Sequence, residues 1–113
     1  MTLLPRDTNS WGTIFGGVIL SHIDLAGGIA AQRYASKRFV TRAIRGVEFI
    51  APVYVGDLVS FYGQVIGEGK TSLTVKIEVE TEHPRRPGVP VKVTEAEVTY
   101  VAVDESGKPV PIK

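Results

Sequence analysis

Hydrophobic positions along this 113-residue chain first follow a helical period and then a period of two. Over residues 18–36, apolar side chains recur around most of the circumference of a helix, which predicts a helix that needs protein on nearly every side. The segment becomes polar only at its end, where Arg33, Lys37 and Arg38 lie at the terminus that the helix dipole favours for cations. The pattern therefore predicts one long, largely enclosed helix.

Four stretches of alternating polar and apolar side chains follow the helix and predict four long strands. They cover residues 39–51, residues 58–66, a segment around residues 73–80, and residues 91–103. The first alternation slips between Ile44 and Val47, and Gly46 lies at the slip, so we expect a β-bulge there. A short strand at residues 2–4 would bring the sheet to about five strands.

One apolar helix and one antiparallel sheet have a simple joint arrangement, an α+β fold in which the sheet wraps around the helix. We expect residues 1–113 to form a single domain of this kind, because the length leaves little room for a second core. A single helix cannot cover such a sheet, and the edges of the sheet stay open. We therefore expect a homo-oligomer with a dimer as its smallest unit.

Composition and charge exclude several classes of function. A net charge of +1 gives no reason to expect nucleic acid or a membrane surface as a partner. The chain has no cysteine, which removes disulfides and thiolate catalysis and suits a reducing cytoplasm. We see no signal peptide at the N-terminus, and His22 and Asp24 interrupt the longest apolar stretch, so no membrane span is expected. His83 has no second ligand near it in the sequence, so no metal site is expected either.

Asp24 is the most informative polar residue, because an isolated carboxylate is costly to desolvate in the middle of an apolar helix. Spacings of four and three place it on one helical stripe with small residues, namely Gly17, Ser21, Gly28 and Ala31. Such a stripe lets a slim ligand or another backbone come close to the acid. The alternative is that Asp24 only forms hydrogen bonds across a dimer interface and that the glycines only permit packing.

Two further features are compatible with catalysis. Gly16 and Gly17 lie at the entry of the helix, which we expect to begin near Gly16, and free backbone N–H groups and the positive end of the dipole there suit a developing oxyanion. A tight turn explains the glycine pair as well. The Asn9 amide can orient a water or polarise a carbonyl, although an asparagine in a loop more often forms a local turn.

These segments together resemble one known family. The matching motifs are Pro-Arg-Asp-Thr-Asn at residues 5–9, Phe-Gly-Gly at residues 15–17, Asp-Leu-Ala-Gly-Gly at residues 24–28, and Gly-Lys-Thr-Ser at residues 69–72. With residues 47–53, 55–57 and 94–96, they resemble the hotdog-fold acyl-CoA thioesterases of the bacterial YciA type, which are related to the cytosolic acyl-CoA hydrolases of animals. The resemblance implies a hotdog fold, hydrolysis of fatty acyl-CoA to free acid and CoA without a cofactor, and a homo-oligomer that is usually a trimer of dimers.

The resemblance also implies roles for individual residues. Asp24 corresponds to the catalytic carboxylate and Asn9 to the catalytic asparagine, which the family places across a dimer interface from each other. Gly17 corresponds to the backbone donor that faces the thioester oxygen. Asp24 would then act as a general base on water, or as a nucleophile that forms an anhydride.

CoA itself is expected to contact residues outside this centre. Gly16 belongs to the helix entry, and Thr71 and Ser72 match a segment that lies along CoA in relatives. Because CoA carries phosphates, nearby cations become candidates, although for any one of them a solvated surface charge is the more common explanation. These cations are Lys70, Arg85, Arg86 and Lys108.

Three rival interpretations remain. A hotdog hydratase or dehydratase needs an Asp–His pair on the helix, but the residue five positions after Asp24 is Ile29. A non-catalytic acyl-CoA sensor normally carries a DNA-binding segment, for which this chain has neither the length nor the charge. The third is a purely structural oligomer in which Asp24 is an interface residue.

Overall fold

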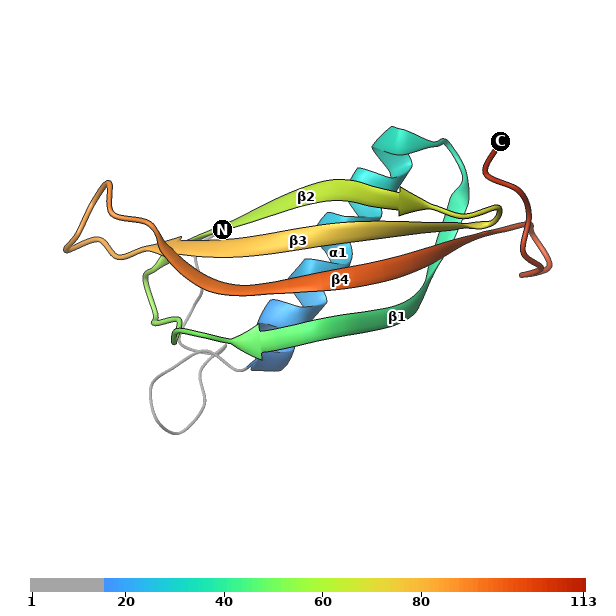
Figure 1. The fold of residues 1–113 in the computed structure, drawn as a ribbon. Coiled ribbons are helices and arrows are strands. Elements are labelled where there is room, and N and C mark those ends of the chain that lie inside the picture. Colours follow the sequence, from blue (N-terminus) through green and yellow to red (C-terminus); the bar gives the residue numbers. More distant parts are fainter. Residues whose placement is uncertain (1–15) are drawn as a thin grey trace.

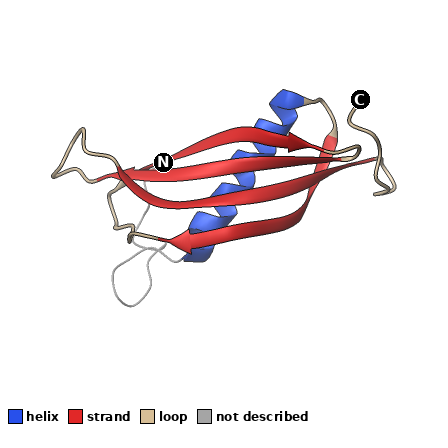
Figure 2. Ribbon diagram, viewed as in Figure 1, coloured by secondary structure: helices blue, strands red, loops and turns tan. Residues whose placement is uncertain are grey.

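The described part of the chain folds as one helix packed against one antiparallel sheet (Figure 1). The computed structural model describes residues 16–113. Its elements are α1 (Gly16–Tyr34), β1 (Arg38–Phe49), β2 (Leu58–Glu68), β3 (Ser72–Glu82) and β4 (Val91–Val103). Figure 2 shows the helix lying obliquely across one face of the sheet. This is the α+β arrangement expected from the sequence; the strand expected at residues 2–4 lies outside the described residues.

The described part of helix α1 begins at Gly16, where the sequence places the helix entry. Its buried residues repeat every four positions and therefore lie on the single stripe that faces the sheet: Ile19, Ile23, Gly27 and Ala31. On another side of the helix, Leu25 is 63% exposed and Ile29 is 58% exposed. Within one chain the sheet thus covers only part of the apolar circumference, and the enclosure expected from the sequence is incomplete.

The sheet has the strand order β1-β4-β3-β2, so the last strand in the sequence lies between the first and the third. The alternation expected for β3 is confirmed, since its inward residues are fully buried. These residues are Leu73, Val75, Ile77 and Val79. The bulge expected at Gly46 is also confirmed, because Gly46 has a φ of +66° and the register slips between Arg45 and Glu48. A second slip, between Thr41 and Ala43, was not expected.

The two connections of β3 lie at opposite ends of the sheet. The hairpin to β2 precedes Ser72, and the basic loop of residues 83–90 follows Glu82. Because β3 has 11 residues, these ends are about 35 Å apart. In the described part of the chain, no helix is long and apolar enough to cross a membrane.

Candidate active site

Asp24 lies where helix α1 passes over strands β1 and β4. Its carboxylate is half-buried, and Oδ1 accepts a hydrogen bond of 2.7 Å from the Thr41 hydroxyl. The Tyr100 hydroxyl lies 3.2 Å from the same Oδ1 and 2.7 Å from the backbone oxygen of Asp24. Oδ2 accepts no hydrogen bond from residues 16–113. One carboxylate oxygen is therefore held by the sheet, and the other is available to a ligand or water.

Thr41 and Tyr100 reach Asp24 together because they are directly opposite each other in the β1–β4 ladder. Side chains of opposite residues share one face of a sheet, and here that face carries the helix. The sequence does contain a signal for both residues, since each is a polar group at an inward position of its strand. Thr41 follows Phe39 in the alternation of β1, and Tyr100 stands between Val98 and Ala102 in β4.

Tyr100 approaches the helix closely because residue 27 is a glycine. A Cβ at Gly27 would lie 2.2 Å from the Tyr100 hydroxyl and 3.0 Å from two atoms of its ring. Tyr100 is only 2% exposed. Its burial, then the negative charge of Asp24 and the hydrogen bond to it, raise the pKa of Tyr100 well above the ordinary value of 10.0. The phenol therefore stays protonated and able to donate at any ordinary pH.

The carboxylate faces an open groove of about 550 Å³. Its walls come from the exposed side of α1 and from the two strands beneath it. The lining residues are Asp24, Leu25, Gly28, Ile29, Gln32, Arg33, Phe39, Thr41 and Tyr100. Asp24 is thus not sealed in a dry core, an arrangement that would argue against catalysis.

The start of helix α1 forms a second concave region, of about 300 Å³. Gly16 lines it together with residues 49–53, and a Cβ at Gly16 would lie 3.3 Å from the Phe49 ring. Gly17 is exposed, and a Cβ there would meet no atom within 4 Å among the described residues. The first-turn amides of a helix lack intrahelical acceptors, so this end can receive a partial negative charge.

Gly17 and Asp24 lie far apart on α1 for two groups that act on one carbonyl group. They are seven residues apart on α1, which corresponds to about 10 Å along the helix axis. A thioester carbon attacked by water must lie within about 3 Å of both the attacking oxygen and its own oxyanion donor. A catalytic centre that uses both groups is therefore better formed between two copies of the chain.

Comparisons with known proteins agree on one family. The family model described as "Thioesterase superfamily" matches residues 12–87, which is more than half of the chain. The chain belongs to the thioesterase superfamily.

Relatives and solved structures of this superfamily resemble nearly the whole chain. The "Acyl-CoA thioester hydrolase YciA" of Escherichia coli strain K12 is 43% identical over 94% of this chain and 82% of its own length. A hexameric hotdog fold thioesterase of Campylobacter jejuni superposes with a TM-score of 0.93 at 43% identity, covering 100% of this chain and 86% of its own. An acyl-CoA hydrolase from Staphylococcus aureus, solved with butyryl coenzyme A, has a TM-score of 0.91 at 28% identity and covers 99% of this chain and 68% of its own. The hotdog fold implied by the sequence motifs is confirmed.

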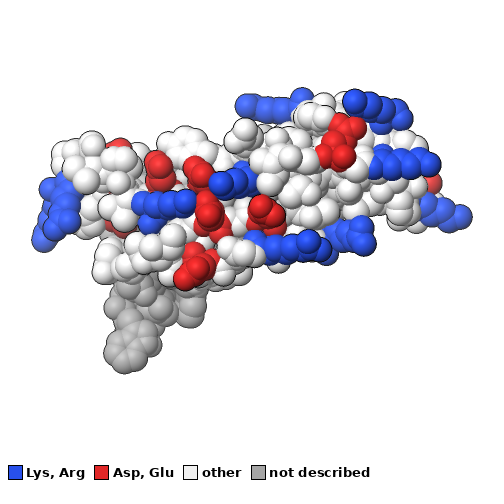
Figure 3. Space-filling model, viewed as in Figure 1, with Lys and Arg blue, Asp and Glu red and all other residues white. Residues whose placement is uncertain are grey.

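The residues expected to contact CoA lie at opposite ends of this superfamily member. Arg85 and Arg86 are exposed on the loop after β3, where they line a cavity of about 490 Å³. That cavity shares Ala51 and Pro52 with the one at Gly16, so the arginines lie beyond the helix entry. Figure 3 shows Lys and Arg side chains at both ends of the molecule.

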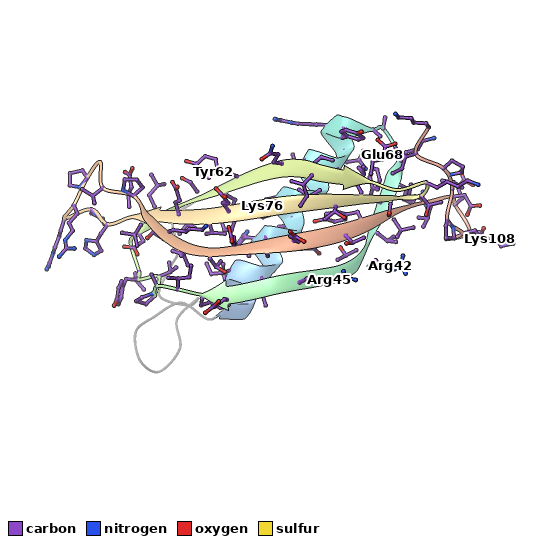
Figure 4. All side chains as sticks on the ribbon, viewed as in Figure 1. Arg42, Arg45, Tyr62, Glu68, Lys76 and Lys108 are labelled. Atoms are coloured by element: carbon purple, nitrogen blue, oxygen red, sulfur yellow. The ribbon has the colours of Figure 1, made fainter. Side chains whose placement is uncertain are left out.

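The other expected contacts lie at the end of the molecule nearer to Asp24. Lys70 is exposed in the β2–β3 hairpin, whose backbone is tied to the C-terminal part of the chain by hydrogen bonds from Ala102 N–H to Thr71 O and from Ile112 N–H to Lys70 O. Ser72 pairs with Val101, the residue next to Tyr100. Lys108 lies beyond β4 at the same end (Figure 4). The expected CoA contacts thus form two clusters that one chain does not bring together.

Other residues singled out in the sequence have different outcomes. Asn9 lies outside the described residues, so its expected role stays a prediction. His22 packs against the Phe61 ring, with ring centroids 5.8 Å apart, and takes no part in the hydrogen bonds around Asp24. Over residues 16–113, no group of three or more His, Asp or Glu side chains is arranged to hold a metal ion.

Proposed function

We propose that this chain hydrolyses acyl-CoA thioesters to free acid and CoA, with Asp24 as the essential acid. The observation that carries the proposal is the carboxylate itself, which is held at Oδ1, unbonded at Oδ2 within residues 16–113, and open to a groove of about 550 Å³. Membership of the thioesterase superfamily supports the reaction type. The printed names of relatives, which describe acyl-CoA thioester hydrolases, support the substrate class.

In the proposed reaction Oδ2 of Asp24 takes a proton from a water molecule as that water attacks the thioester carbonyl carbon. The tetrahedral oxyanion that forms is stabilised by the backbone N–H of Gly17 in the partner subunit and by the dipole of that helix. When the intermediate collapses, the C–S bond breaks and CoA leaves as the thiol, with Asp24 returning the proton. The reaction consumes only water and needs no cofactor. Asn9 is assigned to orienting the water or the carbonyl, as the family resemblance implies.

A dimer with antiparallel helices satisfies the distance requirement. A two-fold axis near the middle of the segment between Gly17 and Asp24 would bring Gly17 of each subunit to Asp24 of the other. The exposed Leu25 and Ile29 lie on the side of α1 that such a partner would cover. Hexamers among the structural neighbours support assembly of three such dimers.

The same pairing accounts for the two basic clusters. Antiparallel helices place the Arg85–Arg86 end of one subunit toward the Lys70 end of its partner. We assign this combined region, with Thr71, Ser72 and Gly16, to the CoA moiety, because phosphates favour sites with several cations. We place the reaction in the cytoplasm, because the absence of cysteine is compatible with a reducing compartment in which disulfides do not form.

The direct test is the Asp24→Asn variant in a thiol-release assay with acyl-CoA substrates of several chain lengths. Loss of a positioned base lowers turnover by on the order of a hundredfold to ten-thousandfold, and we expect a loss in that range with unchanged elution on size exclusion. Glu105→Gln, which removes one carboxylate from the exposed tail, serves as the matched control and should keep the parental rate. A near-parental rate for Asp24→Asn would show that Asp24 is not part of the mechanism. If the parent chain releases no thiol, the hydrolase proposal fails and acyl-CoA binding is the remaining function.

A single turnover in H₂¹⁸O separates the two roles open to Asp24. If Asp24 is a general base, the label enters the product acid directly. If Asp24 is a nucleophile and water attacks the aspartyl carbonyl of the anhydride, the first turnover transfers an unlabelled carboxylate oxygen to the product and leaves the label in the enzyme.

A further inference from the structure

The Tyr100 hydroxyl is a buried polar group that the proposed reaction does not use. Its ring fills the inward position between Val98 and Ala102, both fully buried and apolar, and a phenylalanine would fill the same space. The hydroxyl adds only polar contacts, and within residues 16–113 both of these go to Asp24. A buried hydroxyl without a partner is unfavourable, so this hydroxyl is matched to Asp24 specifically.

Gly27 makes this contact possible at a cost to the helix. Glycine in a helix interior is about 1 kcal/mol less favourable than alanine. At Gly28, the adjacent position, a Cβ would meet nothing within 4 Å, whereas at Gly27 it would overlap the Tyr100 hydroxyl. Because Gly27 has no side chain, the Tyr100 hydroxyl can lie directly against the helix turn that carries Asp24.

We propose that Tyr100 is a positioning residue for Asp24, which fixes the direction of the carboxylate through a donated hydrogen bond made possible by Gly27. The inference rests on the proposed function, in which Asp24 takes the proton. The hydroxyl carries one proton and faces two acceptors of the same residue, the backbone oxygen at 2.7 Å and Oδ1 at 3.2 Å. It thereby ties the position of the helix turn to the orientation of the side chain.

Tyr100 and Thr41 act on the carboxylate from two adjacent strands, and their situations differ. Thr41 is exposed, so water can replace its hydroxyl if that is removed. Tyr100 is buried, so removal of its hydroxyl leaves little room for a substitute donor. With both donors on Oδ1, rotation of the carboxylate is restricted and Oδ2 stays directed toward the groove. The raised pKa of Tyr100 keeps this donor protonated wherever the enzyme is assayed.

The test is the Tyr100→Phe variant, which removes one oxygen atom and leaves the ring. We expect kcat to fall by about fivefold, equivalent to about 1 kcal/mol at 25 °C, with KM within twofold of the parent. Tyr62→Phe removes the same atom from an exposed side chain of β2 (Figure 4) and should leave both constants unchanged. Size exclusion and circular dichroism check that each variant keeps the assembly and the fold.

A double variant distinguishes positioning from a general effect on stability. The single variants Thr41→Val and Tyr100→Phe each remove one donor, whereas Thr41→Val/Tyr100→Phe removes both from the carboxylate. We expect the combined loss of kcat to differ from the product of the single losses, because residues that share one partner are energetically coupled. Losses that simply multiply, or a Tyr100→Phe variant whose kcat equals that of Tyr62→Phe, would overturn the inference.

The Tyr100→Phe and Asp24→Asn variants are compared in the same assay. If Asp24→Asn is inactive while Tyr100→Phe keeps the parental kcat, the positioning role fails and the proposed hydrolase mechanism stands. If Asp24→Asn keeps its activity, the mechanism and the positioning role both fail.

Discussion

Replacing Gly27 with alanine tests the closest contact between the helix and the sheet. The new Cβ would lie 2.2 Å from the Tyr100 hydroxyl and 3.0 Å from two of its ring atoms, so that the ring or the helix has to move. Overpacking of this kind costs about 1–3 kcal/mol, and loss of the hydrogen bond to Asp24 adds about 1 kcal/mol. The higher helix propensity of alanine returns about 1 kcal/mol. We expect the free energy of unfolding to fall by about 2 kcal/mol.

Gly28→Ala is the matched control, because it makes the same chemical change one position later. It meets no atom within 4 Å among the described residues, so helix propensity should raise the free energy of unfolding by up to about 1 kcal/mol. The two variants should therefore differ by about 3 kcal/mol. Urea unfolding followed by circular dichroism measures this difference, at one fixed protomer concentration and again at a tenfold higher one, since association also affects stability. Equal stability of Gly27→Ala and Gly28→Ala would refute the close packing of Tyr100 against the helix.

Two further outcomes follow from the same structure. Because the pKa of Tyr100 is raised in the folded state, its contribution to stability is fully present below pH 10 and is lost as the pH rises above 10 toward the folded pKa. The urea midpoint of the parent should thus decline between pH 10 and about 11.5 more steeply than that of Tyr100→Phe, and parallel declines would contradict this assignment. Leu25→Glu places a charge on the exposed apolar side of α1 and should shift size-exclusion elution toward a smaller species, whereas Ser36→Glu, just beyond the helix, should not. Unchanged elution of Leu25→Glu would place the subunit contact elsewhere.

The sequence predicted the elements well because their patterns are local. The alternation of β3 and the glycine at the slip in β1 each depend on residues a few positions apart, and both predictions are confirmed. The second bulge of β1, between Thr41 and Ala43, contains no glycine and leaves no such local signal. The helix entry at Gly16 was also expected from the sequence, because the glycine pair there directly precedes the apolar helical pattern.

The site was predicted only in part, because its geometry depends on register between distant segments. Asp24 could be singled out as one carboxylate in an apolar helix. Its partners Thr41 and Tyr100 lie 17 and 76 positions away, and only the β1–β4 pairing shows that they meet. The sequence also pointed to Gly28 as the glycine beside Asp24, whereas Gly27 is the one that the sheet contacts. Which of two adjacent glycines faces inward depends on the rotation of the helix, which the pattern alone does not define to within one residue.

The position of β4 between β1 and β3 has a consequence for synthesis of the chain. Strand β1 follows the helix directly, but within the described sheet its only neighbour is the last strand to leave the ribosome. Until residues 91–103 emerge, β1 has no hydrogen-bonded partner in that sheet, and the aspartate lacks the tyrosine that contacts it. A nascent chain that stalls before this point exposes an unpaired apolar edge, and the contact between Asp24 and Tyr100 forms only once β4 has joined the sheet.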